Sequence, residues 1–162
     1  MNQEKLDYCN GFLEAMQLLN SEVSDVYANF ELELLPPSTD LESALNRYFE
    51  EYGRHQISPA REFPAERWNI STTSSAESPE QTLHDVCSKW FFISSTMSAA
   101  PKNYHYRHNV LVTFIDALKS ALGSFSVRTV HIHPPFWYAM EWDNLVLETD
   151  EACYMLHLSH SD

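Results

Sequence analysis

The sequence predicts an α+β domain in which N-terminal and central helices pack on one face of a C-terminal antiparallel β-meander. Two observations lead to this prediction. Apolar residues recur at spacings of three and four through most of residues 3–122, as they do along one face of a helix. After Gly123 the period changes to two, the spacing of side chains that share one face of a strand. Helices followed by consecutive strands are typical of the α+β class.

Helical periodicity occurs in five stretches, namely residues 3–19, 23–35, 39–52, 78–91 and 103–122. The third stretch opens with capping-box spacing at Thr39, and we expect it to stop at Gly53. The fourth opens with Ser78 as an N-cap and Pro79 in the first turn. The fifth is expected to stop at Gly123.

The second stretch, "VSDVYANFELELL" at residues 23–35, fits two structures. Its apolar residues have helical spacing, but Phe30, Leu32 and Leu34 also alternate as they would in a strand. We predict a helix that ends before Pro36, because proline disfavours helical backbone at the residue before it.

Residues 55–78 lack periodicity and are rich in Pro, Ser and Thr. We interpret them as an irregular loop within one domain, residues 1–162, because too little chain lies on either side for two well-buried cores. Beyond Gly123, "SVRTVHIH" (residues 126–133) predicts a strand that ends at Pro134. The last strands, residues 145–148 and 153–158, flank a turn at 149–152 and predict a closing β-hairpin.

The charge balance favours a basic protein partner over nucleic acid. The chain has 10 Lys and Arg against 23 Asp and Glu, a net charge of −13, which repels phosphate backbones. Acidity that serves solubility alone gives the same balance. With only 3 Gly there is no Gly-rich phosphate loop, and no cofactor is expected. Three unpaired cysteines, no apolar signal segment and no membrane-length apolar run predict a cytoplasmic protein.

The histidines of the predicted sheet are candidate ligands of a metal site. If Val130 and Ile132 face the helices together with the leucines of the hairpin, then His131, His133 and His157 share the opposite face. The chain has no H-E-x-x-H or paired-Cys spacing, and so no metal is predicted. Nor does it have a G-x-S-x-G elbow or a specific carboxylate pair, and we predict no catalytic residue and no enzymatic activity.

The stretch "WYAMEWDNL" at residues 137–145 interleaves aromatic and acidic residues. Aromatic side chains anchor protein interfaces, and neighbouring acids pair with Lys or Arg of a basic partner. The predicted partner-binding residues, on this stretch and the following hairpin, are Trp137, Glu141, Trp142, Asp143, Glu148, Asp150, Glu151 and Asp162.

The last 24 residues, "AMEWDNLVLETDEACYMLHLSHSD" at 139–162, resemble the closing hairpin of immunity proteins from bacterial contact-dependent inhibition and type VI secretion systems. Such hairpins have a "dlvle" strand, an acidic turn and a "yyLHfg-SD" strand. The resemblance implies a cytoplasmic, non-enzymatic protein that neutralises one cognate, cationic, nuclease-like toxin by occluding its active site or an adjacent site. Two alternatives stay open: a metal-dependent enzyme that uses His131, His133 and His157, and an acidic nucleic-acid-mimic inhibitor or adaptor.

Overall fold

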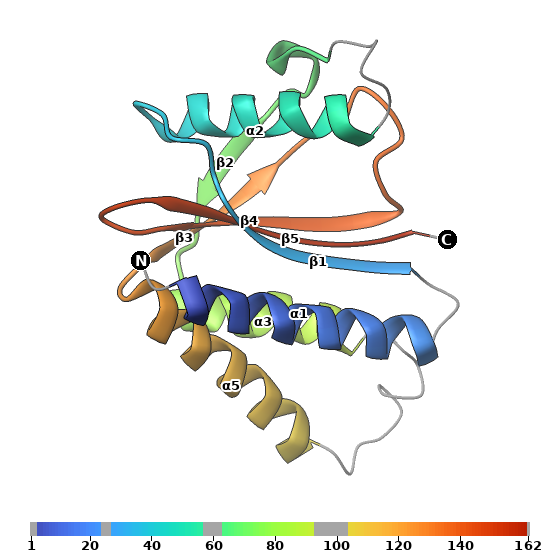
Figure 1. Ribbon diagram of the computed structural model, residues 1–162, viewed down its shortest axis with the longest axis vertical. Coiled ribbons are helices and arrows are strands. Elements are labelled where there is room, and N and C mark those ends of the chain that lie inside the picture. The colour runs from blue at the N-terminus through green and yellow to red at the C-terminus, as the bar shows by residue number, and fades with distance from the viewer. Residues whose placement is uncertain (1–2, 24–26, 57–62, 93–103, 162) are drawn as a thin grey trace.

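The computed structural model describes residues 3–23, 27–56, 63–92 and 104–161. Its helices are α1 (Gln3–Val23), α2 (Leu41–Gln56), α3 (Pro79–Phe91) and α5 (Tyr104–Leu122), with a short 3-10 helix η1 (Ala65–Arg67). Its strands are β1 (Tyr27–Leu34), β2 (Ser71–Ser74), β3 (Ser126–His131), β4 (Glu141–Glu148) and β5 (Cys153–Ser161). These strands form one antiparallel sheet in the order β1-β5-β4-β3-β2 (Figure 1).

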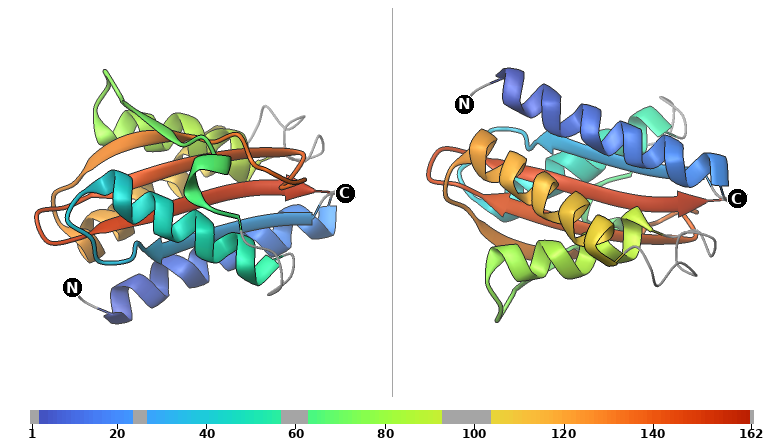
Figure 2. Two further views of the ribbon diagram at one scale, coloured as in Figure 1. Left: turned by 90° about the horizontal axis from the view of Figure 1, so that it is seen from above. Right: turned by 90° about the horizontal axis from the view of Figure 1, so that it is seen from below.

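Helices lie on both faces of this sheet. On one face, α1, α3 and α5 pack over a core that includes the fully buried Trp90, Phe91 and Phe114 (Figure 2). On the other face, α2 packs over a second core around Phe49 and Trp68. The predicted α+β class is confirmed. The sequence analysis placed the helix predicted at residues 39–52 on the same face as the other helices, but as α2 it covers the opposite face of the sheet.

The helix predicted for residues 23–35 is wrong where the structure describes it, because Tyr27–Leu34 form the edge strand β1. Residues 24–26 lie outside the described ranges. Ala28, Phe30 and Leu32 are buried on the side of α1, and β1 pairs with β5 along its full length. Burial of alternate side chains and strand pairing together outweigh the local helical spacing.

The outer edge of β1 is covered by polar side chains of α1. Asn10 accepts a hydrogen bond from the Leu32 N–H at 3.0 Å and donates one to the Leu32 carbonyl at 3.1 Å. Gln17 and Ser21 accept from two further β1 amides, at 3.1 and 3.3 Å. An exposed strand edge is a template for unwanted pairing with another chain, so this row of side chains protects β1.

We predict that Asn10→Ala lowers the free energy of unfolding by roughly 1–3 kcal/mol, because it leaves the Leu32 N–H and carbonyl without their partner. Urea denaturation monitored by circular dichroism measures the change. Glu14→Ala, an exposed substitution one turn along α1, is the matched control and should shift stability by less than about 0.5 kcal/mol. Equal stabilities of the two variants would contradict the protective role of Asn10.

The segment predicted as an irregular loop, residues 55–78, contains the end of α2, η1 and the edge strand β2. Residues 57–62 of this segment lie outside the described ranges. β2 pairs with β3, and Trp68 between η1 and β2 is fully buried. α2 continues through Gly53, where a Cβ atom would lie 3.3 Å from Phe63 and 3.4 Å from Trp68. Gly53 therefore permits close packing and does not end the helix.

The predicted start of α3, the end of α5 and the position of the closing turn agree with the structure, whereas α1, β4 and β5 are longer than predicted and β3 ends earlier, at His131. The Ser78 hydroxyl accepts the N-cap hydrogen bond from the Gln81 N–H at 3.2 Å. Gly123 follows α5 with φ +77°, a conformation that glycine adopts without strain. The closing hairpin is confirmed, with the Thr149 N–H donating to the Ala152 carbonyl at 2.9 Å. Among the described helices, none has the length and apolarity needed to cross a membrane.

Candidate functional site

The predicted partner-binding residues do not form one surface. Trp137, at 70% exposure, and Glu141 lie near the start of β4, whereas Asp150 and Glu151 lie in the turn beyond its end. At roughly 3.4 Å per residue, β4 separates the two groups by about 24 Å. Asp162 lies outside the described residues.

Several of these side chains already have intramolecular partners. Asp143 accepts a hydrogen bond from the Trp90 indole N–H at 2.7 Å and pairs with Lys89 at 3.2 Å. Lys89 also lies 3.8 Å from Glu141. These contacts connect the start of β4 to α3 and support the fold.

Two further residues of the predicted set, Trp142 and Glu148, also contact other side chains of the protein. Trp142 is half-buried with its ring 5.3 Å from that of Tyr138. Glu148 pairs with Arg128 across β3 and β4 at 3.0 Å. Both side chains are therefore less accessible to a partner than Trp137, which is 70% exposed.

The histidines predicted to share a sheet face are on opposite faces. Val130 and Ile132 pack into the core under α2, so the side chain of His131 points to the other face, and His133 follows the end of β3. His157 is buried on the α2 side. Within the described ranges there is no group of three or more His, Cys, Asp or Glu side chains that could hold a metal ion.

His157 instead belongs to a buried polar network. Its Nδ1 lies 2.7 Å from Asn144 Oδ1, which can only accept, so Nδ1 carries the proton and Nε2 accepts from the Ser159 hydroxyl at 2.9 Å. Burial lowers the pKa of His157 to about 4, and the ring is neutral at pH 7. This serine–histidine–asparagine order is that of catalytic triads. Ser159, however, is only 5% exposed, and the network joins β4 to β5 within the core.

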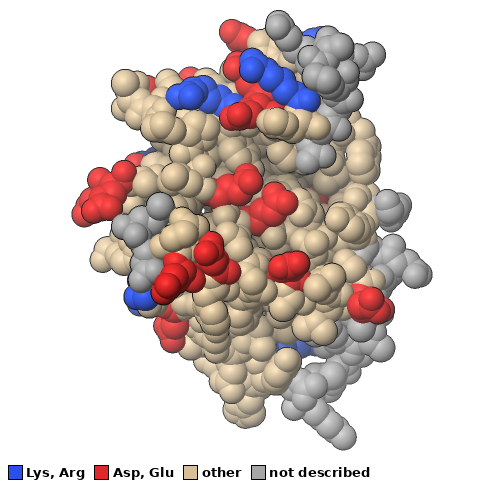
Figure 3. Space-filling model, viewed as in Figure 1, with Lys and Arg blue, Asp and Glu red and all other residues tan. Residues whose placement is uncertain are grey.

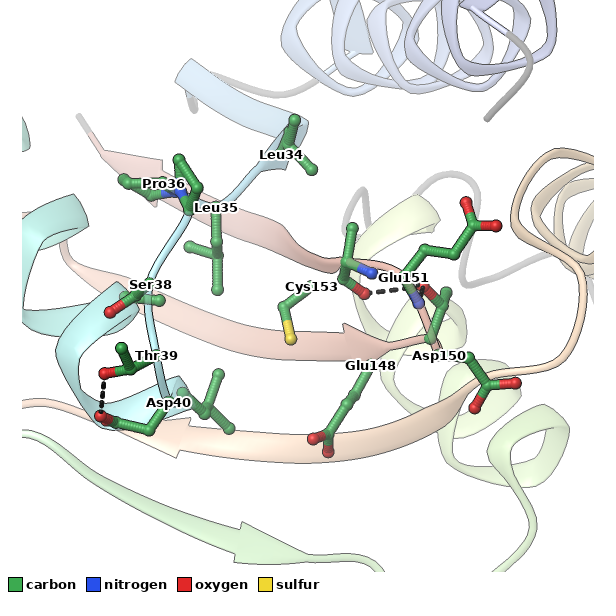
Figure 4. Close-up of a pocket in the computed structure, with 15 residues that line it drawn as sticks. Leu34, Leu35, Pro36, Ser38, Thr39, Asp40, Glu148, Asp150, Glu151 and Cys153 are labelled. Atoms are coloured by element: carbon green, nitrogen blue, oxygen red, sulfur yellow. Dashed lines mark hydrogen bonds between the residues drawn. The ribbon is translucent and has the colours of Figure 1, made fainter.

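Two surface hollows flank the connection from β1 to α2. The first, the hairpin hollow, has a volume of about 530 Å³ and lies between the start of α2 and the β4–β5 turn (Figure 4). Asp40, Glu148, Asp150 and Glu151 lie around the apolar Leu35 and Cys153, as Figure 4 shows. Two of these acids have intramolecular partners: Glu148 binds Arg128, and Asp40 caps α2 by accepting from the Ser43 N–H at 2.8 Å.

The second hollow, the β1–α2 groove, has a volume of about 590 Å³. Its lining side chains come from β1, the β1–α2 connection and α2: Glu31, Glu33, Leu34, Pro36, Tyr48, Glu51, Tyr52 and His55. Glu31 and Glu33 point to the α2 side because Phe30 and Leu32 alternate with them into the opposite core. None of the described residues that line this groove is Lys or Arg.

The carboxylates of the β1–α2 groove lie close enough to affect one another and the tyrosines. Burial raises the pKa of Glu31, and the negative charge of Glu33 raises it further. Burial also raises the pKa of Tyr52 to about 12, with contributions from Glu31 and Glu33. The pKa of Tyr48 is raised by burial, by the charge of Glu33 and by a hydrogen bond to it. The described lining of the groove therefore carries negative charge without a Lys or Arg beside it.

The sequence analysis missed the β1–α2 groove because it assigned β1 to a helix. A strand interpretation of "FELEL" places Glu31 and Glu33 on one face, opposite Phe30 and Leu32. That alternation was the available signal. No sequence pattern indicated that Glu51 and Tyr52 of α2 would line the groove, because their position depends on how α2 crosses the face of the sheet.

Comparisons with known proteins give no family for this chain. No family model matches, and no curated protein matches. Solved structures that match include citrus MAF1 in two crystal forms, with TM-scores of 0.47 and 0.46 and identities of 14% and 15%. Each match covers 97% of this chain and 98% of the other.

These matched structures are not toxin-immunity proteins, and the predicted immunity function is wrong. The roles that followed from it, namely those of a toxin inhibitor or antitoxin in contact-dependent inhibition or type VI secretion, are withdrawn with it. Nothing is transferred from MAF1 in their place, because similarity at this TM-score and identity carries no functional argument.

Proposed function

We propose that this protein is a non-enzymatic binding protein whose β1–α2 groove holds a basic segment of a polypeptide partner. The observation that carries the proposal is the set of three carboxylates, Glu31, Glu33 and Glu51, on a groove whose described lining has no Lys or Arg. A guanidinium or ammonium group placed among them relieves their mutual repulsion.

The shape of the groove favours an extended segment over a compact ligand. On β1, Tyr27 and Asn29 continue the row of Glu31 and Glu33 toward the start of the strand, and Tyr27 is 62% exposed. Four alternate residues of a strand span roughly 20 Å, enough for several residues of an extended peptide. Beyond Glu33, at the end of β1, Leu34 also lines the groove and is 51% exposed. Apolar side chains at both ends and carboxylates between them suit a segment with basic residues at its centre.

The hairpin hollow extends this surface. Both hollows share Leu34 and Pro36, so a segment that leaves the groove past Leu34 reaches the acids of the hairpin turn. Asp150 and Glu151, which the sequence analysis placed in an interface, would contact this part of the partner. A cytoplasmic location, expected from the unpaired cysteines, stays a prediction alongside this function.

We predict that Glu31→Gln/Glu33→Gln/Glu51→Gln weakens binding of a synthetic Arg- and Lys-rich peptide by roughly 10- to 100-fold, since each lost charge pair contributes about 0.5–1 kcal/mol. Fluorescence anisotropy of the labelled peptide at low salt gives the dissociation constant. The matched control is Glu66→Gln/Glu77→Gln/Asp116→Asn, which removes three exposed charges elsewhere. This control should change binding by less than about threefold.

Equal losses in the two triple variants would contradict the proposal, because they would mean that net charge, and not the groove, attracts the peptide. Nuclear magnetic resonance titration of the isotope-labelled protein gives a second test. Amide shifts should concentrate on β1 and on the second half of α2. Shifts confined to other elements would also contradict the proposal.

A further inference from the structure

Helix α1 has three faces, and only two of them have a role in the fold. Residues at one face fill the core under the sheet: Leu6, Cys9, Leu13, Met16 and Asn20. A second face carries Asn10, Gln17 and Ser21, which bond the edge of β1. The third face points away from the protein, yet it carries Tyr8, Leu18 and Leu19 at 57%, 56% and 47% exposure.

Small residues lie between these large apolar side chains. Tyr8, Gly11, Ala15 and Leu18 follow one another at spacings of three, four and three, so they form one stripe along the helix. Gly11 is exposed, and a Cβ atom there would meet nothing within 4 Å. Glycine within a helix costs roughly 1 kcal/mol relative to alanine, and no contact with the described residues requires it at position 11. The stripe leaves room for another backbone to approach α1 closely.

Acidic residues lie at both ends of this stripe and along the side of it that is nearer to Asn10 and Gln17. Glu4, Asp7, Glu14 and Glu22 are all exposed on α1, and acidic side chains are scattered along this helix in Figure 3. Lys5 is the one basic residue of α1, and it donates to the Ser120 carbonyl at 3.0 Å on the side of α5. Glu22 lies in the last turn of α1, where the helix dipole disfavours negative charge, and that turn has no basic residue.

We propose that the outward face of α1 is a docking surface for an amphipathic helix of a partner protein, with an apolar ridge flanked by Lys or Arg. The apolar ridge would pack between Tyr8 and Leu18 over Gly11 and Ala15, and the basic flanks would pair with the bordering carboxylates. Small residues at a helix contact allow interaxial distances near 8 Å. Charge complementarity disfavours a second copy of this chain as the occupant, because two copies of α1 would bring the acids of one against those of the other.

The test uses the full chain and a labelled 21-residue synthetic peptide, helical, with Leu and Ala along one face and Lys on both sides of it. We expect saturable one-to-one binding by fluorescence anisotropy. Gly11→Leu should raise the dissociation constant at least about tenfold, because the side chain fills the approach to the stripe. It should leave Tm unchanged or higher, since leucine is the better helix former and meets no neighbour.

Thr113→Leu, which adds an exposed apolar side chain to α5, is the matched control and should not affect binding. The triple variant of the β1–α2 groove should also bind the helical peptide normally, which separates this surface from the proposed function. Lack of saturable binding at millimolar peptide would overturn the proposal. So would equal binding of a peptide with the same composition in scrambled order. A dimer in analytical ultracentrifugation that Gly11→Leu dissociates would overturn it too, because the occupant would then be a second copy.

Discussion

Replacing Trp68 by alanine should lower the free energy of unfolding by about 4 kcal/mol, the largest effect that we expect from a single substitution in the α2 layer. Trp68 is fully buried beneath α2, and its ring lies 5.1 Å from Phe49 and 5.0 Å from Phe136. Tyr52 and Tyr138 complete its surroundings at 6.3 and 6.0 Å. Removing the indole leaves a cavity that this cluster of rings cannot close.

The indole N–H of Trp68 allows a second substitution that separates the effect of the ring volume from that of the polar group. Trp68 Nε1 is buried and has no hydrogen-bond partner among the described residues, which is unfavourable for a polar group in the core. Trp68→Phe keeps most of the ring and removes this N–H. We therefore expect it to cost much less than Trp68→Ala, roughly 1–2 kcal/mol, as measured by chemical denaturation. Similar losses in both variants would show that ring volume does not determine the stability of this layer.

Loss of the Trp68 ring should also change the shape of the β1–α2 groove. Tyr52 lines that groove and contacts the Trp68 ring, so a loosened α2 changes the position of one groove wall. If the β1–α2 groove binds a basic peptide, as we propose, Trp68→Ala should weaken this binding under conditions in which most of the protein is still folded. Glu31 and Glu33, on the opposite wall, are held by β1 and should stay in place.

Hydrophobic periodicity predicted the helices that have a clear apolar stripe and local end signals. α3 is the best example, since Ser78 and Pro79 mark its start and its apolar positions are buried against the sheet. The closing hairpin was predictable for a similar reason, because the alternation of β4 and β5 and the intervening polar turn are all local features. Such elements need no information from distant parts of the chain.

Both edge strands were missed, because distant partners determine them. β1 is stabilised by pairing with β5, more than 100 residues away in sequence, and by side chains such as Asn10 and Gln17 of α1. β2 is a four-residue polar strand with no apolar alternation, and it exists through pairing with β3. Neither partner can be identified from the local sequence alone.

The phase of β3 explains why the predicted histidine face does not exist. The sequence analysis placed Val130 on the same face as Leu145. In the structure Val130 is opposite Asn144 across β3 and β4, so the pairing of these strands is shifted by one residue from the predicted one. Each side chain of β3 therefore lies on the face opposite to the predicted face. This single shift moves His131 to the face opposite His157. The candidate groove depends likewise on how α2 crosses the sheet, which periodicity does not specify.

Acidification should destabilise the protein through His157. The folded-state pKa is lowered to about 4 by burial, against 6.5 for an unburied imidazole. Above pH 6.5 the ring is neutral in both states, and its contribution to stability is fully present. Between pH 6.5 and 4 the unfolded chain binds a proton that the folded protein does not, so stability falls as pH falls. At 1.36 kcal/mol per pH unit the loss attributable to His157 is about 3 kcal/mol.

The measurement is the free energy of urea unfolding at a series of pH values from 7 to 4, for the wild type and for His157→Gln. Glutamine offers an amide to Asn144 and Ser159 but does not titrate in this range. Other groups, including Glu31 with its raised pKa, contribute to both curves and cancel in the difference. We expect the wild-type curve to fall by about 3 kcal/mol more than that of the variant. Parallel curves would mean that the His157 ring takes up its proton within the fold, with Ser159 turning to accept from Nε2, and that the polar network tolerates a charge at the centre of the sheet.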